Sequence, residues 1–528
     1  MEVMIINALD VLNAGLARLA GQDDRADEWL GSLVEAMDAL SHSRGIRWRA
    51  VLQTVQEHLD VEHNRDGALW CDLIDVLSEW LDRLREPIDV LVIKEGVNLT
   101  DLAQAGWGII FGARDKRAAE IEQALEPLLR WRKKQAGERF KVYKGRDGCR
   151  PGETASAFLK RNGGSAVDPV DPEMVPYYLL IVGSPAGKKG IPFRFQYQLD
   201  VQYAAGRIDF GDDLEAYANY AKSVVAAETG GIVPAPKAIF FGVNNPGDRS
   251  TELSARHLVQ PLSERFQKKK FGNPWQMETI VKEKATKERL LGLMKAAPTF
   301  LFTASHGMEF NKGDARQVGH QGGLLCQDWP GPGSGYGNVS TDYYLAGEDL
   351  TDDVNLQGMI AFLFACYGAG TPLYDEFSKQ AFKESRETIS DAPFVAALPQ
   401  AMLSRPQGGA LAVIGHVERT WAAPFLGVSD NTQITVFEGT VERLFKGYPV
   451  GAAMEYFNGR YAALSTELTM AFEDGSSEPY ELARLWTENN DARGYIVIGD
   501  PAVRLPVAPE TDSDGSQPEP KDEDDDWA

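Results

Sequence analysis

Two short apolar runs constrain the fold of this chain more than any other feature. They are APTFLFTASHGMEF (297–310) and MIAFLFACYGAG (359–370), and each is rich enough in β-branched and aromatic residues for one buried strand. Each run stops at a glycine-containing turn directly after a reactive side chain. The first delivers His306 before Gly307, and the second delivers Cys366 ahead of two glycines.

Active sites of open α/β sheets lie beyond the carboxyl ends of the strands, so neighbouring strands would bring His306 and Cys366 to one edge. A cysteine nucleophile needs a base within reach and backbone N–H groups that hold an oxyanion. A cysteine at a strand end is usually a small core residue, and an isolated histidine is usually structural. The matching positions of the two residues favour catalysis over these readings.

From residue 87 onward, apolar strand patterns alternate with helical patterns. Besides the two runs, strands are expected at 88–94, 106–112, 140–145, 177–183, 237–244, 277–283, 409–417 and 495–503. Amphipathic segments such as DDLEAYANYAKSVVAAE and TKERLLGLMKAA are expected to form helices between them. The alternation predicts an α/β fold with a mostly parallel sheet sandwiched by helices.

The pattern divides the chain into four parts. Residues 1–86 carry four amphipathic helical segments and predict a helical bundle, and residues 87–175 predict an N-terminal α/β subdomain. Residues 176–507 form the expected catalytic domain. The acidic, proline-containing stretch 508–528 has little to bury and is expected to be a disordered tail.

Charge and composition narrow the classes of function. The net charge of −23 disfavours a nucleic acid as the partner. No run has the length of a membrane span, and the N-terminal stretch reads as a helix rather than a signal peptide, so we expect a cytoplasmic protein without membrane contact. The four scattered cysteines indicate a reducing compartment and fit neither a disulfide framework nor a metal site. We therefore expect no metal and no cofactor.

Five motifs in register resemble the gingipain-type cysteine peptidases. YLLIVG followed by IPF and DVQYAAGRI resembles the segment that precedes the catalytic strands of these enzymes. FTASHG and FACYGAG match their histidine and nucleophile turns. GHVERTWAAPF (415–425) and IVIGDPAV resemble the later pocket wall and the closing segment. The family belongs to the caspase-like clan, together with the separase-related CHAT proteases of bacterial defence systems.

The resemblance implies a caspase-like fold in which Cys366 is the nucleophile and His306 is the general acid/base. Backbone N–H groups of Gly307 and Cys366 would form the oxyanion hole. The acidic residue that orients the histidine in gingipains stands just before an Ile-Pro pair. Lys188, Lys189 and Gly190 occupy that place here. The third catalytic residue is therefore left open: it lies elsewhere in the chain, or the site is a Cys–His dyad without one. His416, at the end of the next strand, is the rival base.

The resemblance also implies a pocket for a basic side chain. Asp200 matches the carboxylate that pairs with arginine or lysine at the position before the cleaved bond (P1), and Trp421 matches the pocket wall. The spacing from Tyr203 to Gly206 is shorter than in the family, so the alternative is that Asp200 is a turn residue.

Taken together, the sequence predicts an intracellular cysteine endopeptidase that cleaves a protein partner in a bacterial defence or cell-death pathway. A pore-former or another protease is the expected kind of substrate, and residues 1–86 would bind a regulatory partner. The alternative from another class is a catalytically inactive scaffold with the same fold. A metal-dependent hydrolase is disfavoured, since His306, His320 and Cys326 lack the spacing of metal ligands.

Overall fold

The computed structural model describes residues 93–187, 190–233, 235–334, 339–377, 387–426, 432–474 and 478–508. The expected bundle at 1–86, nearly all of the expected tail and both Lys188 and Lys189 lie outside these residues. In the part that is described, no helix is both long and apolar enough to cross a membrane.

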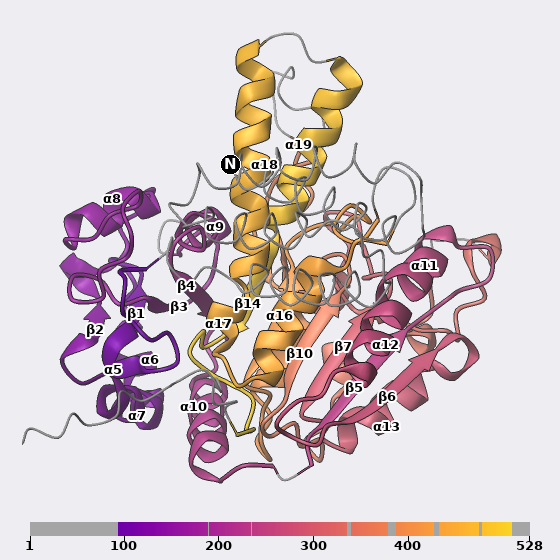
Figure 1. The fold of residues 1–528 in the computed structure, drawn as a ribbon, viewed down its shortest axis with the longest axis horizontal. Coiled ribbons are helices and arrows are strands. Elements are labelled where there is room, and N and C mark those ends of the chain that lie inside the picture. Colours follow the sequence, from indigo (N-terminus) through magenta and orange to yellow (C-terminus); the bar gives the residue numbers. More distant parts are fainter. Residues whose placement is uncertain are drawn as a thin grey trace, which may run out of the picture. The chain divides into compact units, whose positions relative to one another are not determined.

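A single ten-stranded sheet forms the centre of the fold, with the strand order β2-β1-β3-β4-β14-β13-β10-β7-β5-β6 (Figure 1). One half contains β1 (Trp107–Phe111), β2 (Phe140–Tyr143), β3 (Tyr178–Val182), β4 (Ala204–Ile208) and β14 (Tyr495–Gly499). The other half contains β5 (Lys237–Gly242), β6 (Gln276–Val281), β7 (Phe300–Ala304), β10 (Ile360–Phe364) and β13 (Ala412–His416). Each half is parallel within itself, and the halves meet at the antiparallel pair β13–β14.

Apart from the edge strand β6, the strands of the second half are almost uniformly apolar because helices cover both faces of the sheet. All residues of β7, β10 and β13 are buried. Aromatic rings of β7 and β10 pack on Phe437 from α16, with ring centroids of Phe302 and Phe362 at 6.1 and 5.6 Å from that ring. In Figure 1, α12 and α16 lie over this part of the sheet.

The helices of the first half and of the crossovers are short. They are α5 (Leu102–Ala105), α6 (Ala118–Ala124), α7 (Glu126–Ala136), α8 (Ala155–Arg161), α9 (Phe193–Leu199), α10 (Leu214–Thr229), α11 (Arg249–Ser254), α12 (Gln260–Lys268) and α13 (Lys287–Lys295). The later helices are α14 (Gln317–His320), α15 (Ala397–Leu403), α16 (Thr435–Phe445), α17 (Val450–Ala453), α18 (Glu455–Asp474) and α19 (Pro479–Arg493). Two small antiparallel pairs complete the fold: β8 (Leu324–Leu325) with β9 (Tyr344–Leu345), and β11 (Gly370–Thr371) with β12 (Phe394–Val395).

The structure confirms the predicted α/β class, with a mostly parallel sheet flanked by helices. The sheet runs without interruption through both the expected subdomain 87–175 and the expected catalytic domain 176–507. Several elements had no counterpart among the predicted ones, and β4, α9 and α19 are those that bear on the site and the sheet.

Candidate active site

Three neighbouring parallel strands end at the edge of the sheet where the sequence places the reactive residues. Ala304 of β7 pairs with Phe364 of β10, so His306 and Cys366 each stand two residues beyond a matched pair. On the other side of β7 lies β5, and the loop after it carries Asp248. Adjacent strand ends thus deliver a carboxylate, an imidazole and a thiol, in that order.

Asp248 contacts His306 directly. The Nε2 atom of His306 lies 2.6 Å from the Oδ2 atom of Asp248. The carboxylate is itself fixed, because Asp248 caps α11 and accepts hydrogen bonds from the N–H of Ser250 and the hydroxyl of Thr251. Burial alone would raise the pKa of Asp248, but the hydrogen bond and charge of His306 hold it below its usual value. The carboxylate is therefore available to orient the imidazole at neutral pH.

Asp248 is a site residue that the sequence did not reveal, although its setting carried a signal. It follows the predicted strand 237–244 and precedes the amphipathic segment that begins at Thr251, and an aspartate in such a place is a candidate N-cap. Because strand order cannot be read from one sequence, nothing indicated that this strand lies next to β7. The gingipain-like position before Ile191 cannot be compared, since Lys188 and Lys189 lie outside the described residues.

The thiol of Cys366 is half-buried and faces the segment after β13. Its sulfur accepts a hydrogen bond from the N–H of Thr420 at 3.4 Å and lies 3.8 Å from the Thr420 carbonyl oxygen. Burial raises the pKa of the Cys366 thiol to about 11, and the nearby Glu309 carboxylate acts in the same direction. The surroundings of Cys366 therefore raise the pKa of the thiol, whereas an adjacent imidazolium would lower it. The N–H of Thr420 acts to lower the pKa of the thiol, but the effect of burial outweighs it.

Gly307 packs against the backbone of Cys366. A Cβ atom at Gly307 would lie 1.7 Å from the Cys366 carbonyl oxygen, so no other residue fits without displacing the turn. Within the described part of the chain, neither the N–H of Gly307 nor that of Cys366 has a hydrogen-bond acceptor. Both groups are thus free to bind an oxygen atom at this turn.

Two residues in the left-handed backbone region join the turn that carries Cys366 to the segment after β13 by a hydrogen bond. Tyr367 has φ +58° and Glu418 has φ +75°, values that are uncommon outside glycine. The N–H of Tyr367 donates to the carbonyl of Glu418 at 2.6 Å. The Glu418 side chain accepts from the guanidinium of Arg419, and burial raises the Glu418 pKa to about 8.

A buried carboxylate on α19, Asp491, binds the segment that follows β13. Asp491 accepts hydrogen bonds from the N–H of Trp421 at 2.9 Å and from the hydroxyl of Thr420 at 3.3 Å. Burial raises the pKa of Asp491, whereas the nearby His416 and Arg460 act to lower it. The segment 418–421 is thus positioned by α19, which the sequence analysis had not assigned.

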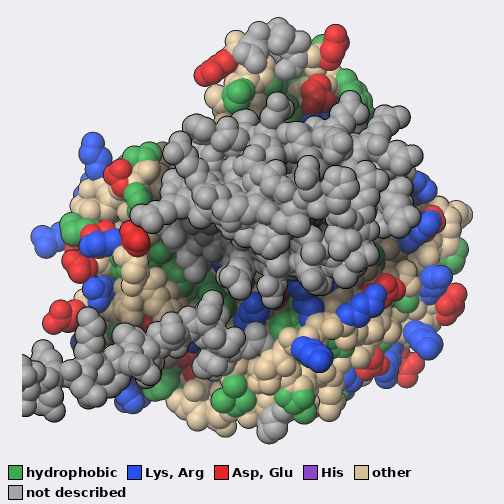
Figure 2. Space-filling model, in the orientation of Figure 1, with side chains coloured by type: hydrophobic (Ala, Val, Ile, Leu, Met, Phe, Trp, Pro, Cys, Tyr) green, Lys and Arg blue, Asp and Glu red, His purple; other side chains and the backbone are tan. Residues whose placement is uncertain are grey.

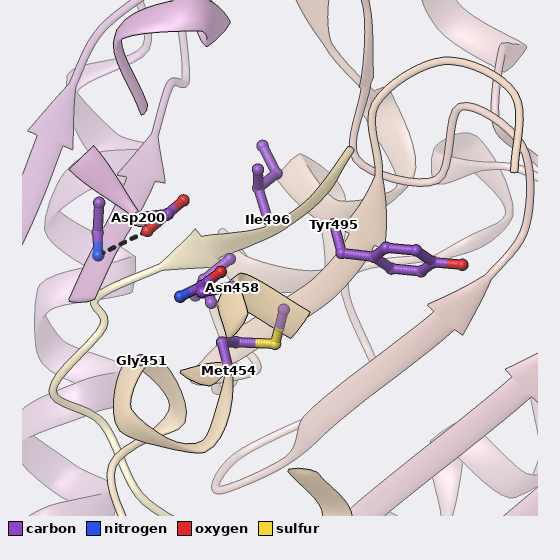
Figure 3. Close-up of a pocket in the computed structure, with 8 residues that line it drawn as sticks. Asp200, Gly451, Met454, Asn458, Tyr495 and Ile496 are labelled. Carbon is purple, nitrogen blue, oxygen red and sulfur yellow. Dashed lines mark hydrogen bonds between the residues drawn. The ribbon is translucent and has the colours of Figure 1, made fainter. Parts of the chain in front are cut away.

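Asp200 and Trp421, the two predicted specificity residues, lie in different surroundings. Asp200 ends α9, accepts a hydrogen bond from the N–H of Ala205 at 2.9 Å, and lines a pocket too narrow to hold a water molecule (Figure 3). Burial raises the pKa of Asp200 well above its usual range. Trp421 does not line this pocket. Its ring is 44% exposed and lies 5.8 Å from that of Phe377.

Glu309 is an exposed carboxylate that contacts the turn carrying Cys366. This residue follows His306 by three positions, and its Oε1 accepts a hydrogen bond from the hydroxyl of Tyr367 at 2.9 Å. Its charge contributes to the raised pKa of Cys366. Glu309 therefore places a negative charge beside the thiol on the side of the histidine loop.

The rival base His416 is part of the core. Its side chain is fully buried, with Nε2 at 2.9 Å from the Asp491 carbonyl oxygen and Nδ1 at 3.2 Å from the Glu418 carbonyl oxygen. His320 binds the Tyr344 hydroxyl at 2.8 Å, and Cys326 is fully buried. Among the described residues, no three His, Cys, Asp or Glu side chains are grouped as metal ligands.

Comparisons with known proteins give structural likeness without sequence likeness. No family model matches the sequence, and no curated protein matches it either. Among solved structures, the Arg-specific cysteine proteinase gingipain R aligns over 76% of this chain and 78% of its own, with 11% identity and a TM-score of 0.43. The complex of Porphyromonas gingivalis RgpB pro- and mature domains aligns over 76% and 80%, with 13% identity and a TM-score of 0.41. The Saccharomyces cerevisiae separase–securin complex aligns over 62% of this chain and 16% of its own matched chain, with 11% identity and a TM-score of 0.30.

Proposed function

We propose that this protein is an intracellular cysteine endopeptidase with Cys366 as nucleophile, His306 as general acid/base and Asp248 as the group that orients the histidine. The observation that carries the proposal is the 2.6 Å contact between His306 and Asp248. It fixes the imidazole at the end of β7, next to the strand that ends in Cys366. The nucleophile, base and orienting carboxylate are the three roles that acyl transfer requires.

The proposed reaction uses the second nitrogen of the imidazole. With Nε2–H donated to Asp248, Nδ1 is the basic nitrogen, and no hydrogen bond to a described residue engages it. Nδ1 takes the proton of the Cys366 thiol while sulfur attacks the peptide carbonyl carbon, and the N–H groups of Gly307 and Cys366 bind the resulting oxyanion. The C–N bond then breaks, the leaving amine takes the proton from His306, and a water activated by His306 hydrolyses the thioester.

The resting thiol must turn from Thr420 toward His306 before this reaction starts. Burial raises the pKa of the thiol and so favours a protonated sulfur, and the contact with Thr420 holds that sulfur at the segment after β13. A substrate strand that binds the backbone of residues 420–421 competes for the same N–H and carbonyl groups. Substrate binding would therefore release the thiol, which makes the resting enzyme a poor nucleophile toward small reagents.

The proposed substrate preference is arginine or lysine beside the cleaved bond. The sequence resemblance assigns this role to Asp200, and Glu309 is the second candidate because its exposed carboxylate lies beside the nucleophile turn. A positional peptide library separates the two. Loss of the basic preference in Asp200→Asn supports the first assignment, and its loss in Glu309→Gln supports the second. Cleavage after uncharged residues by the native protein rejects both.

The compartment, pathway and regulation in this proposal rest on the sequence. A cytoplasmic location follows from the scattered cysteines and the lack of a membrane-length apolar run. The resemblance to caspase-clan proteases is the ground for the other points, which are a role in bacterial defence or cell death, a pore-former or protease as substrate, and a regulatory partner bound by residues 1–86. Removing residues 1–86 tests the last point. A truncated protein that cleaves a short peptide normally, yet no longer responds to its partner, supports regulation, and one that aggregates contradicts it.

Cleavage of fluorogenic peptides by the native chain, Cys366→Ala and His306→Ala tests the enzymatic proposal. We expect each variant to lose at least about 10⁴-fold in activity while its melting temperature stays near that of the native protein. The raised thiol pKa is the observation that favours the alternative, an inactive scaffold. A native chain that cleaves no member of a broad library and no unfolded protein supports that alternative.

A further inference from the structure

The helices α18 and α19 form a hairpin that extends away from the sheet (Figure 1). The first part of α18 belongs to the core, where Phe457 is fully buried and its ring lies 4.5 Å from that of Tyr495. Farther along, the two helices bury Leu464, Leu468 and Leu485. The distal half of the hairpin therefore needs only its inner face for its own stability.

Large apolar side chains remain exposed at the free end of this hairpin. Met470 is 57% exposed, Phe472 51% and Tyr480 84%. We call these three residues the hairpin tip. Within the described part of the chain, only one other aromatic side chain, Trp421 in the candidate active site, is comparably exposed. Exposed apolar side chains gathered at one end of a projecting element are typical of an interaction site.

The hairpin tip is surrounded by negative charge. Residues 466–488 contain one arginine, Arg484, and six acidic residues: Glu467, Glu473, Asp474, Glu478, Glu481 and Glu488. Arg484 is paired with Glu481 and Glu488. No ion pair joins Glu467, Glu473 or Glu478 to another described residue. Acidic side chains are visible on this lobe in Figure 2. The chemistry that complements the tip is therefore a basic segment with apolar anchors.

The other end of the hairpin is part of the candidate active site. Asp491 of α19 accepts hydrogen bonds from the hydroxyl of Thr420 and the backbone N–H of Trp421, and Asn490 donates to the carbonyl of Glu376. Tyr480 precedes Asp491 by eleven residues, which corresponds to about 16 Å along a helix at about 1.5 Å per residue. An extended chain covers that distance in about five residues at about 3.3 Å per residue.

We propose that the hairpin tip is a docking site for a basic, apolar segment of the protein substrate, lying about five or more residues from the cleaved bond. This inference rests on the proposed function, since it takes the active-site end of α19 as the place of cleavage. Trp421 lies on the opposite side of Cys366 from the histidine loop. In this proposal the docking segment lies on the N-terminal side of the cleaved bond. Such a site selects one protein from many without further contacts at the catalytic turn.

A binding experiment on the full chain carrying Cys366→Ala tests the docking site without requiring catalysis. The probes are two labelled helical peptides of identical apolar pattern, one with Lys and Arg at its polar positions and the other with Glu. We expect the basic peptide to bind, to bind more weakly as salt is raised, and to lose at least about tenfold in affinity in Met470→Ser/Phe472→Ser/Tyr480→Ser. If the triple variant misfolds, the single variant Tyr480→Ser, at the most exposed position of the hairpin tip, still tests the loss of affinity.

The matched control replaces Val167, Ile232 and Val318 by serine, because these apolar side chains are equally exposed elsewhere. It should leave the affinity unchanged. Equal binding of the acidic peptide, absence of binding, or equal losses in control and tip variants each overturn the proposal. So does concentration-dependent dimerisation of the chain that the tip variant abolishes, since the occupant would then be a second copy.

A cleavage experiment tests the role of the docked segment. A peptide that the native protein cleaves is compared with the same peptide extended on its N-terminal side by the basic probe. We expect the extension to raise kcat/KM at least about tenfold, and the tip variant to abolish this gain without changing cleavage of the short peptide. A gain that survives in the tip variant contradicts the proposal. If no peptide is cleaved, the proposed function fails, and the binding result still decides whether the tip is a docking site.

Discussion

Asp248 is the residue on which the proposed chemistry depends most. In Asp248→Asn, the side-chain oxygen can still cap α11, but the amide group would face Nε2 of His306 with a donor. The imidazole would then carry its proton on Nδ1 and could not accept one from the thiol. We expect kcat to fall by about 10²–10⁴-fold with little change in KM for a short peptide. Asp213→Asn, which alters the N-cap of α10 in the same way, should retain full activity.

The same substitution has a consequence for acid stability. The pKa of Asp248 is lower in the folded protein than in the unfolded chain, so its stabilising contribution is present above about pH 4. That contribution is lost as the pH falls through the folded pKa. The native protein should therefore lose more stability than Asp248→Asn between neutral pH and the acid range. Parallel acid-unfolding curves for the two proteins would contradict the ion pair.

The pH dependence of alkylation reports the state of the Cys366 thiol. With a pKa of about 11, the thiolate fraction should rise about tenfold per pH unit between pH 7 and 9. The rate at which iodoacetamide modifies Cys366 should rise in the same proportion, with Cys366→Ser as the blank. Cys149 and Cys326 are buried with thiol pKa values of about 12 and should react more slowly still. A rate that stays flat from pH 6 to 8 would indicate a thiolate–imidazolium pair in the resting protein.

Among the elements, those with continuous apolar runs were predictable and those with mixed composition were not. The strands around His306 and Cys366 could be placed because every residue of β7 and β10 is buried. In contrast, β4 is built from small residues and the buried Arg207, because Gly206 approaches the backbone of Gly499 too closely for a Cβ atom. A strand of that composition has no apolar signature.

The helix α19 could not be predicted from the sequence for a related reason. Its last turns bury Asn489, Asn490 and Asp491, which serve the site rather than the core. Polar residues at inward positions interrupt the helical apolar pattern. Sequence periodicity therefore located the reactive strand ends, while the parts that position them, Asp248 and α19, depended on strand order and on buried polar contacts that appear only in three dimensions.

The turn after β7 is the element with the least tolerance for change. In Gly307→Ala the added Cβ would meet backbone atoms of Cys366, so the turn must shift. We expect a loss of about 1–3 kcal/mol in the free energy of unfolding and a loss of nearly all peptidase activity. The control is Gly292→Ala in the exposed part of α13, where no atom lies within 4 Å of the new Cβ. That variant should gain about 0.5–1 kcal/mol, and urea unfolding measures both. Equal stabilities of the two variants would show that the turn can relax.

At the scale of the whole described domain, one buried cluster ties the first half of the sheet to its last strand. Asp500, directly after β14, accepts hydrogen bonds from the indole of Trp107 in β1 at 2.9 Å and from the guanidinium of Arg132 in α7 at 2.7 Å. Arg132 also binds Glu228 of α10 at 2.6 Å. The aspartate of the closing Gly-Asp-Pro motif therefore has a structural role, since it joins strands of the sheet to α7 and, through Arg132, to α10.

Removal of Arg132 should therefore destabilise the protein as a whole. Arg132→Ala leaves the fully buried Asp500 without its cationic partner, and breaking such a pair costs about 3–5 kcal/mol. Arg484→Ala removes two ion pairs on the partly exposed surface of α19 and should cost less than about 1 kcal/mol. Urea unfolding followed by tryptophan fluorescence and by accessibility of Cys366 measures both. If the ten strands form one cooperative unit, both signals shift together in Arg132→Ala, because the halves share the β13–β14 pair. A shift in fluorescence alone would mean that the first half unfolds independently and that the candidate active site does not depend on it.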